Sequence, residues 1–77
     1  MSVLTCKVIS EPIYMGEICM FNVQTEFETY TILSKDIQAV KDYIFVDKEQ
    51  IIQLEGEIIG NTMFPVKGKL QLIKSKE

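Results

Sequence analysis

An alternation of apolar and polar residues predicts three β-strands in the first half of the chain. The segments Val3–Ser10 and Glu17–Thr25 carry apolar side chains at every second position, which is the period of a strand with one buried face. Thr29–Leu33 is rich in β-branched and aromatic residues and predicts a third strand. Pro12 and Gly16 separate the first two strands, so we expect an antiparallel hairpin there. The expected inward-facing residues of that hairpin are Leu4, Cys6, Val8, Cys19, Phe21 and Val23.

The register of the hairpin follows from matching apolar residues across its two strands. With the turn centred near Pro12–Ile13, the facing pairs are Leu4 with Phe21, Cys6 with Cys19, and Val8 with Glu17. The two cysteines become neighbours in this arrangement. We expect them to be reduced core residues, because a cross-strand disulfide demands a restrictive geometry and no histidine is present to complete a zinc site.

A helical period replaces the strand period in the middle of the chain. The segment Asp36–Ile44 places apolar residues three and four positions apart, which predicts one short amphipathic helix. Either Ser34 or Asp36 is its expected N-cap. The charged segment Phe45–Gln50 then connects the helix to the next strand.

A glycine lies at the centre of that next strand, Ile51–Gly60, which reads IIQLEGEIIG. Gly56 costs stability within a strand, so it indicates a bend or the close approach of another backbone segment. We expect a loop from Gly60 to Lys67 and a fifth strand at Lys69–Ser75. The expected core residues of the fourth strand are Ile52, Leu54, Gly56 and Ile58, with Gln53, Glu55 and Glu57 on the solvent side.

This order of elements predicts an all-β fold with one short helix. A helix between the third and fourth strands is typical of the five-stranded barrel of the oligonucleotide/oligosaccharide-binding (OB) type. The 77 residues have room for one domain, spanning residues 1–77. No run approaches about 18 apolar residues, and no basic segment precedes an apolar run at the N-terminus. We therefore expect a cytoplasmic protein without a membrane span.

The chain lacks the residues that common catalytic sites use. It has no histidine to serve as a general base near neutral pH, and no phosphate-binding glycine loop or cluster of metal ligands. Glu55 and Glu57 share one strand face, where they are best interpreted as solvated side chains. We expect no enzymatic activity, no cofactor, no bound metal and no small-molecule substrate.

Four short motifs resemble the single-stranded DNA-binding protein family, which includes the primosomal replication protein. They are Cys19–Val23, Tyr30–Lys35, Tyr43–Ile44 and Ile52–Ile58. The last is the most specific, since the family carries an apolar-x-apolar-Glu-Gly-x-apolar strand at this place. The chain departs from the family in having no tryptophan, a longer lead into the fourth strand, and no acidic C-terminal tail. The resemblance implies an OB fold that binds single-stranded DNA in replication or repair.

Binding of a single strand needs aromatic faces on which bases stack and lysines that follow the phosphates. Tyr14 in the first loop and Phe64 in the loop after the fourth strand are the candidate stacking residues. Tyr30 is a third candidate if its face of the sheet is open. The candidate phosphate contacts are Lys67, Lys69, Lys74 and Lys76. An equally weighted alternative is that these lysines protect a solvated edge strand from aggregation.

The net charge restricts which nucleic acid the chain can bind. The formal charge is −3, and the chain has no arginine, which argues against sequence-specific duplex recognition. With four lysine–phosphate contacts, log affinity should fall against log salt with a slope of about −3. Nothing in the sequence distinguishes DNA from RNA as the ligand.

Apolar residues on outward faces indicate self-association. Ile18 and Met20 lie on the outer face of the second strand, and Ile51 and Ile59 on that of the fourth. Exposed apolar patches of this kind often mark interfaces, so we expect a homo-oligomer, which would also place several sets of lysines along one nucleic-acid strand. The alternative function is an OB-type protein-interaction module whose acidic surface avoids nucleic acid.

Overall fold

The computed structural model describes residues 1–35, 46–66 and 70–74, and within these ranges the regular elements are strands. They are β1 (Ser2–Val8), β2 (Ile13–Met15), β3 (Ile18–Gln24), β4 (Thr29–Ser34), β5 (Ile51–Ile59), β6 (Thr62–Pro65) and β7 (Gln71–Lys74). The helix expected at residues 36–44 lies outside the described residues. The described ranges contain no helix that is long and apolar enough to cross a membrane.

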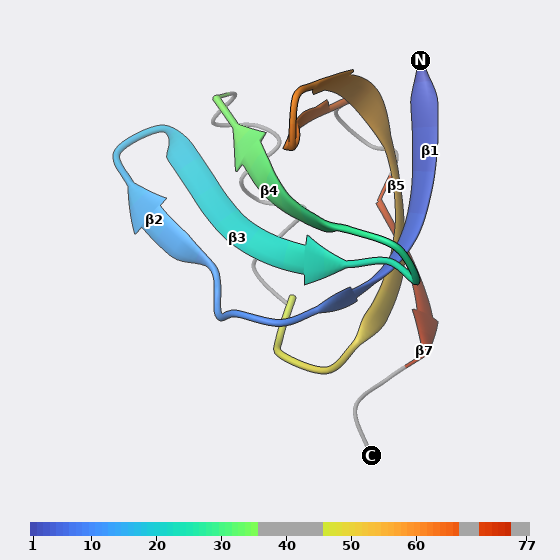
Figure 1. Ribbon diagram of the computed structural model, residues 1–77. Coiled ribbons are helices and arrows are strands. Elements are labelled where there is room, and N and C mark those ends of the chain that lie inside the picture. Colours follow the sequence, from blue (N-terminus) through green and yellow to red (C-terminus); the bar gives the residue numbers. More distant parts are fainter. Residues whose placement is uncertain (36–45, 67–69, 75–77) are drawn as a thin grey trace.

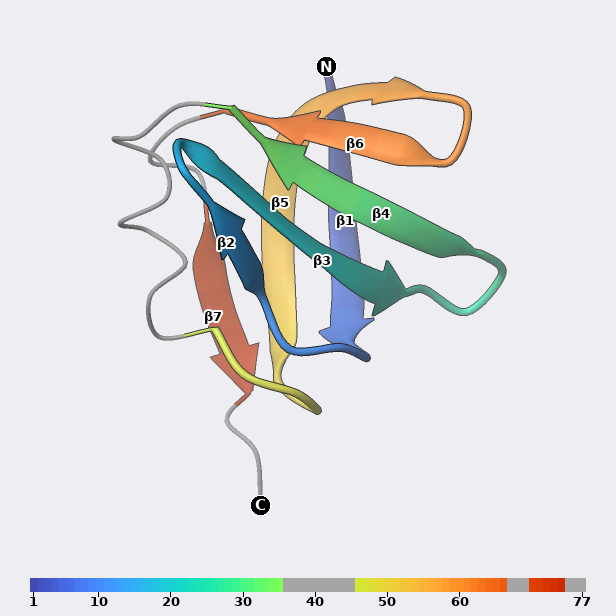
Figure 2. The same ribbon diagram turned by 90° about the vertical axis from the view of Figure 1, so that its left-hand side faces the viewer.

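Five of the strands close into a mixed β-barrel (Figures 1 and 2). Around the barrel the order is β1, β3, β4, β6 and β5, and β5 pairs back with β1 to close the ring. The pairing of β4 with β6 is parallel, whereas the others are antiparallel. Two extra strands are attached to this ring, since β2 pairs with β3 and β7 pairs with β5. The architecture is consistent with an OB-like fold.

The expected inward faces are confirmed, except that Ile58 of β5 is only half-buried. Alternate residues of β1 and β3 are buried, and the same alternation holds along β4 and β5. Leu4 is the exception among the expected residues of the first hairpin, because it is only half-buried against the core. The buried apolar residues are Cys6, Val8, Cys19, Phe21, Val23, Ile32, Val46, Ile52, Leu54 and Met63.

The predicted register of the first hairpin is wrong. Val8 pairs with Val23 of β3, not with Glu17, and Cys6 pairs with Ile52 of β5. The physical reason is that the short strand β2 takes the hairpin position beside β3. As a result only the last two residues of β1 pair with β3, whereas residues 2–7 pair with β5.

The cysteines are therefore not cross-strand neighbours, although both are buried and free, as expected. Cys19 pairs with Tyr14 on one side and with Ser34 on the other. Burial raises the pKa of the Cys6 thiol to about 11, so this thiol stays protonated at neutral pH.

Gly56 marks a close approach between β5 and β6. It pairs with Pro65, and a Cβ atom at this position would overlap the carbonyl oxygen of Phe64 and lie 2.7 Å from the Cα of Pro65. Both are backbone atoms, so no side-chain rotation would relieve the overlap. The expectation that Gly56 permits a close backbone approach is confirmed.

The assignment of the last barrel strand is wrong in the sequence prediction. The segment expected to be a loop contains β6, which completes the ring between β4 and β5. The segment expected to be the fifth barrel strand is instead β7, an additional strand that pairs with β5 at residues 51–53. Two candidate stacking residues are affected: Phe64 lies on β6 and Tyr14 on β2, so neither is in a loop.

Candidate nucleic-acid interface

The outward faces of β3, β4 and β6 form one continuous, nearly uncharged surface. Its members alternate with buried residues along each strand, and β3 pairs with β4, which pairs with β6. We call this surface the β3–β4–β6 face and define it by Ile18, Met20, Asn22, Thr31, Leu33, Thr62 and Phe64. All seven side chains are half-buried. Apolar groups and neutral hydrogen-bonding groups therefore lie next to one another on this face.

The polar residues of the face are held by hydrogen bonds. The hydroxyl of Thr31 donates to Oδ1 of Asn22 at 3.0 Å, across the β3–β4 pair. The backbone N–H of Asn22 donates to the hydroxyl oxygen of Ser10 at 2.8 Å. The first bond holds the side-chain amide of Asn22 on the outside of the barrel, and the second holds its backbone.

The tight turn between β5 and β6 is held by hydrogen bonds to the first residues of β4. Gly60 has a φ of +62°, a left-handed conformation that glycine adopts without strain. The next residue, Asn61, accepts a hydrogen bond from the N–H of Thr31 at 2.8 Å and donates its side-chain amide to the carbonyl of Thr29 at 3.2 Å. This turn therefore has a defined position at one border of the β3–β4–β6 face.

Phe64 is the aromatic residue of this face. The ammonium nitrogen of Lys35, which follows β4, lies 5.4 Å from the centroid of the Phe64 ring. A cation at this distance is attracted by the ring quadrupole. Glu57 pairs with Phe64 from the neighbouring strand β5, so a carboxylate also lies beside the ring. Within the described part of the chain, an ammonium group and a carboxylate thus both lie next to Phe64.

The other two candidate stacking residues are not on this face. Tyr14 pairs with the inward-facing Cys19, and burial raises the pKa of its hydroxyl, with further increases from the charge of Cys19 and a hydrogen bond to it. Tyr30 pairs with Val23 and packs against the core at the other end of β3. The pKa of Tyr30 is raised mainly by a hydrogen bond to Glu28.

Tyr14 and Tyr30 also lie far from each other. Their partners on β3 are four residues apart, which corresponds to about 13 Å along a strand. Phe64, Tyr14 and Tyr30 are consequently not gathered into one aromatic surface.

Of the four candidate lysines, only Lys74 is among the described residues. It is exposed on β7 and pairs with Ile51 of β5. Phe64 pairs with Glu57, six residues further along β5, which corresponds to about 20 Å. Lys74 and Phe64 are therefore at different ends of the barrel. The remaining candidates, Lys67, Lys69 and Lys76, lie outside the described residues.

The outward apolar residues expected to mediate self-association lie in two places. Ile18 and Met20 are half-buried beside the exposed Met15 and Ile13 of β2, with which they pair. Ile51 is half-buried, and Ile59, at the end of β5, is 60% exposed.

Sequence reasoning did not identify Lys35 as a site residue. The signal was available, because Lys35 continues the outward positions Thr31 and Leu33 by two residues. Charge density alone favours the four C-terminal lysines over Lys35, which is why the sequence prediction does not include it. Asn22 lies on the same outward face and is likewise not among the contacts predicted from the sequence.

The described residues contain no group of three or more histidine, cysteine or acidic side chains that would hold a metal ion. No protein-family model matches the chain, and no significant match to it was found among curated proteins or solved structures.

Proposed function

We propose that this protein is an OB-type barrel that binds single-stranded nucleic acid, preferably DNA, on the β3–β4–β6 face. In chain order the five barrel strands are β1, β3, β4, β5 and β6. This makes β3 and β4 the counterparts of the second and third OB strands, whose outward surface binds oligonucleotides in that fold. The turn at Gly60–Asn61 corresponds to the loop between the fourth and fifth strands, which borders the same surface.

The observation that carries the proposal is the pair formed by Phe64 and Lys35. A ring for stacking and an ammonium group for a phosphate lie 5.4 Å apart on the face that OB barrels use. Stacking of a base on an aromatic side chain contributes about 1–3 kcal/mol, which is about 5- to 150-fold in affinity. Asn22 supports the proposal as well, because an amide on this face offers hydrogen bonds to an unpaired base.

Electrostatics makes such a binder weak and sensitive to salt. The net charge of −3 and the carboxylate of Glu57 beside Phe64 both oppose a phosphate backbone. Lys67, Lys69, Lys74 and Lys76 remain the proposed phosphate contacts beyond Lys35. With Lys74 about 20 Å from Phe64 along β5, a strand that reaches both must run along the barrel.

The proposal is tested by following the anisotropy of a fluorescein-labelled oligo-dT at about 20 mM and about 150 mM salt. We expect saturable binding that weakens as salt rises, with a slope of about −3.5 if Lys35 and the four C-terminal lysines all contact phosphates. Phe64→Ala and Phe64→Leu should both weaken binding by about 5-fold or more, because neither offers a π face. Loss with Ala but not with Leu would show that Phe64 only fills space.

A matched pair of lysine variants controls for charge. Lys35→Gln should weaken binding and make the salt slope shallower by about 0.7, whereas Lys48→Gln, an exposed lysine before β5, should change neither. Absence of binding at about 20 mM salt would refute the proposal. That outcome would favour the protein-interaction module, for which the exposed Ile13 and Met15 on β2 provide an apolar surface.

A further inference from the structure

The turn between β3 and β4 presents a phenylalanine to solvent. Phe27 is 88% exposed, although it lies on an ordered turn that connects two strands of the barrel. The hydroxyl oxygen of Thr25 accepts hydrogen bonds from the N–H of Phe27 at 3.2 Å and from the N–H of Glu28 at 3.1 Å. The N–H of Thr25 donates to the carbonyl of Glu28 at 2.9 Å. The backbone that carries the ring is thus fixed before any partner binds, which lowers the entropic cost of an interface.

A depression of about 270 Å³ adjoins this turn. Its lining residues are Thr5, Cys6, Lys7, Gln24, Thr25, Glu26 and Ile51. Pockets for drug-sized ligands are larger, about 300–1,000 Å³ and more enclosed, so this depression suits a single inserted side chain. The strand β1 pairs with β3 at only two positions, and the β3–β4 turn projects from the ends of these two strands (Figure 2).

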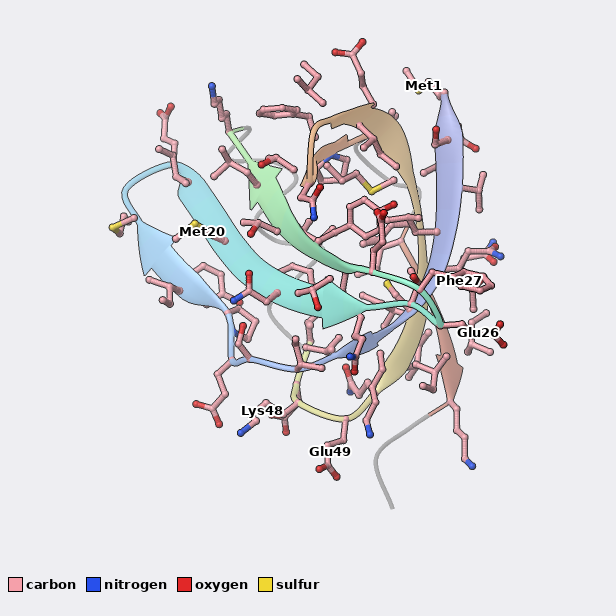
Figure 3. All side chains as sticks on the ribbon, in the orientation of Figure 1. Met1, Met20, Glu26, Phe27, Lys48 and Glu49 are labelled. Atoms are coloured by element: carbon pink, nitrogen blue, oxygen red, sulfur yellow. The ribbon has the colours of Figure 1, made fainter. Side chains whose placement is uncertain are left out.

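Acidic residues flank the ring, and lysines flank Ile51 in the wall of the depression, where Glu26 is the one acidic lining residue. Glu26 and Glu28 flank Phe27 in the sequence, and Figure 3 shows Glu26 and Phe27 together at the end of the turn. On the other side, Lys7 and Lys74 both pair with Ile51, one from each neighbouring strand. The lysines therefore lie on either side of an apolar residue that is itself half-buried in the outer wall.

We propose that two copies of this chain form a two-fold symmetric dimer in which Phe27 of each copy inserts into the depression beside Ile51 of the other. The ring and the depression adjoin on one surface. A single two-fold axis can therefore place the Phe27 ring of each copy in the depression of the other at the same time. The interface is isologous and closes as a dimer instead of growing into a filament. Each copy contributes Lys7 and Lys74 against Glu26 and Glu28, so the charges in the interface balance. The proposal does not depend on the binding of nucleic acid.

Sedimentation of the protein without nucleic acid, from about 10 µM to 1 mM at low salt, tests this dimer. We expect a reversible monomer–dimer equilibrium that weakens with salt. Phe27→Ala should raise the dissociation constant by at least about 100-fold, because two buried aromatic anchors are lost. The control is Ile13→Ala, which removes another exposed apolar side chain, 53% exposed, from β2. A monomer at 1 mM, or a dimer lost with Ile13→Ala and kept with Phe27→Ala, would overturn the proposal.

A charge exchange shows whether the contact is made between copies. Lys7→Glu and Glu26→Lys should each weaken the dimer, because each places like charges across both contacts. When these two variants are mixed, both contacts join opposite charges again, so a 1:1 heterodimer should form with an affinity within about tenfold of the native dimer. If the mixture stays monomeric while the native protein dimerises, Lys7 and Glu26 do not meet across the interface and the proposal is wrong.

Discussion

Substitution of Gly56 by alanine should destabilise the barrel where β5 and β6 meet. The added Cβ would overlap the Phe64 carbonyl oxygen and lie 2.7 Å from the Cα of Pro65, so β6 must move away from β5. Overpacking of this kind lowers the free energy of unfolding by about 3 kcal/mol. This value is in the upper part of the usual range, because the atoms that the Cβ would overlap belong to the backbone. Against this, alanine restricts the unfolded chain and returns about 0.4–1 kcal/mol. The net loss of about 2–2.6 kcal/mol corresponds to a Tm lower by about 8–20 °C for a domain of this size.

Thermal unfolding followed by circular dichroism measures this difference, with urea titration as a second estimate of the free energy of unfolding. The matched control is Gly60→Asn, because nothing lies within 4 Å of a Cβ there and asparagine tolerates the φ of +62°. That variant should melt within about 4 °C of the native protein. A Gly56→Ala protein with the same small change would refute the packing of β6 on β5. Since Phe64 belongs to the displaced strand, Gly56→Ala should also weaken oligonucleotide binding.

Three other residues give independent tests. Burial raises the pKa of Cys6 from 9.0 to about 11, so the free energy of unfolding should fall as pH rises through this range. Urea titrations should show a smaller fall for Cys6→Val than for the native protein, and equal falls would contradict the burial of Cys6. Glu49 has a φ of +72°, so Glu49→Gly should relieve backbone strain and raise the Tm by up to about 8 °C. A lower Tm would mean that the Glu49 side chain stabilises the fold by more than the strain destabilises it. Glu57→Gln should tighten oligo-dT binding at low salt by about twofold or more and have little effect at high salt; weaker binding would place the strand elsewhere.

The long strands could be predicted because their side chains follow a clear period. The segments around Cys19, Phe21 and Val23, and around Ile52 and Leu54, bury every second residue in the structure as the alternation predicts. Gly56 was also informative, since a glycine inside a strand indicates either a bend or a close neighbour.

The short strands could not be predicted from period. β6 spans four residues, includes Pro65 and buries Met63 alone, so its alternation is too short to separate it from a loop. All three residues of β2 are exposed, and the segment is a strand because it pairs with the edge of β3. These errors affect the predicted site, because a Phe64 in a loop would have the lysines that follow it as its partners. In the structure the partner of Phe64 is Lys35, which parallel pairing of β4 with β6 brings close from a distant part of the sequence.

The ladder between β1 and β5 has a kinetic consequence. Ser2–Lys7 finds its partners at residues 51–56, so this strand has little to join until most of the chain is available. The β2, β3 and β4 meander needs only local contacts and can form earlier, during synthesis or at the start of refolding. Until β5 pairs with β1, the backbone hydrogen-bonding groups on one edge of β1 are unpaired. Unpaired strand edges of this kind are sites at which partly folded chains aggregate. Refolding should therefore be slow for so small a protein, and its yield should fall as the protein concentration rises.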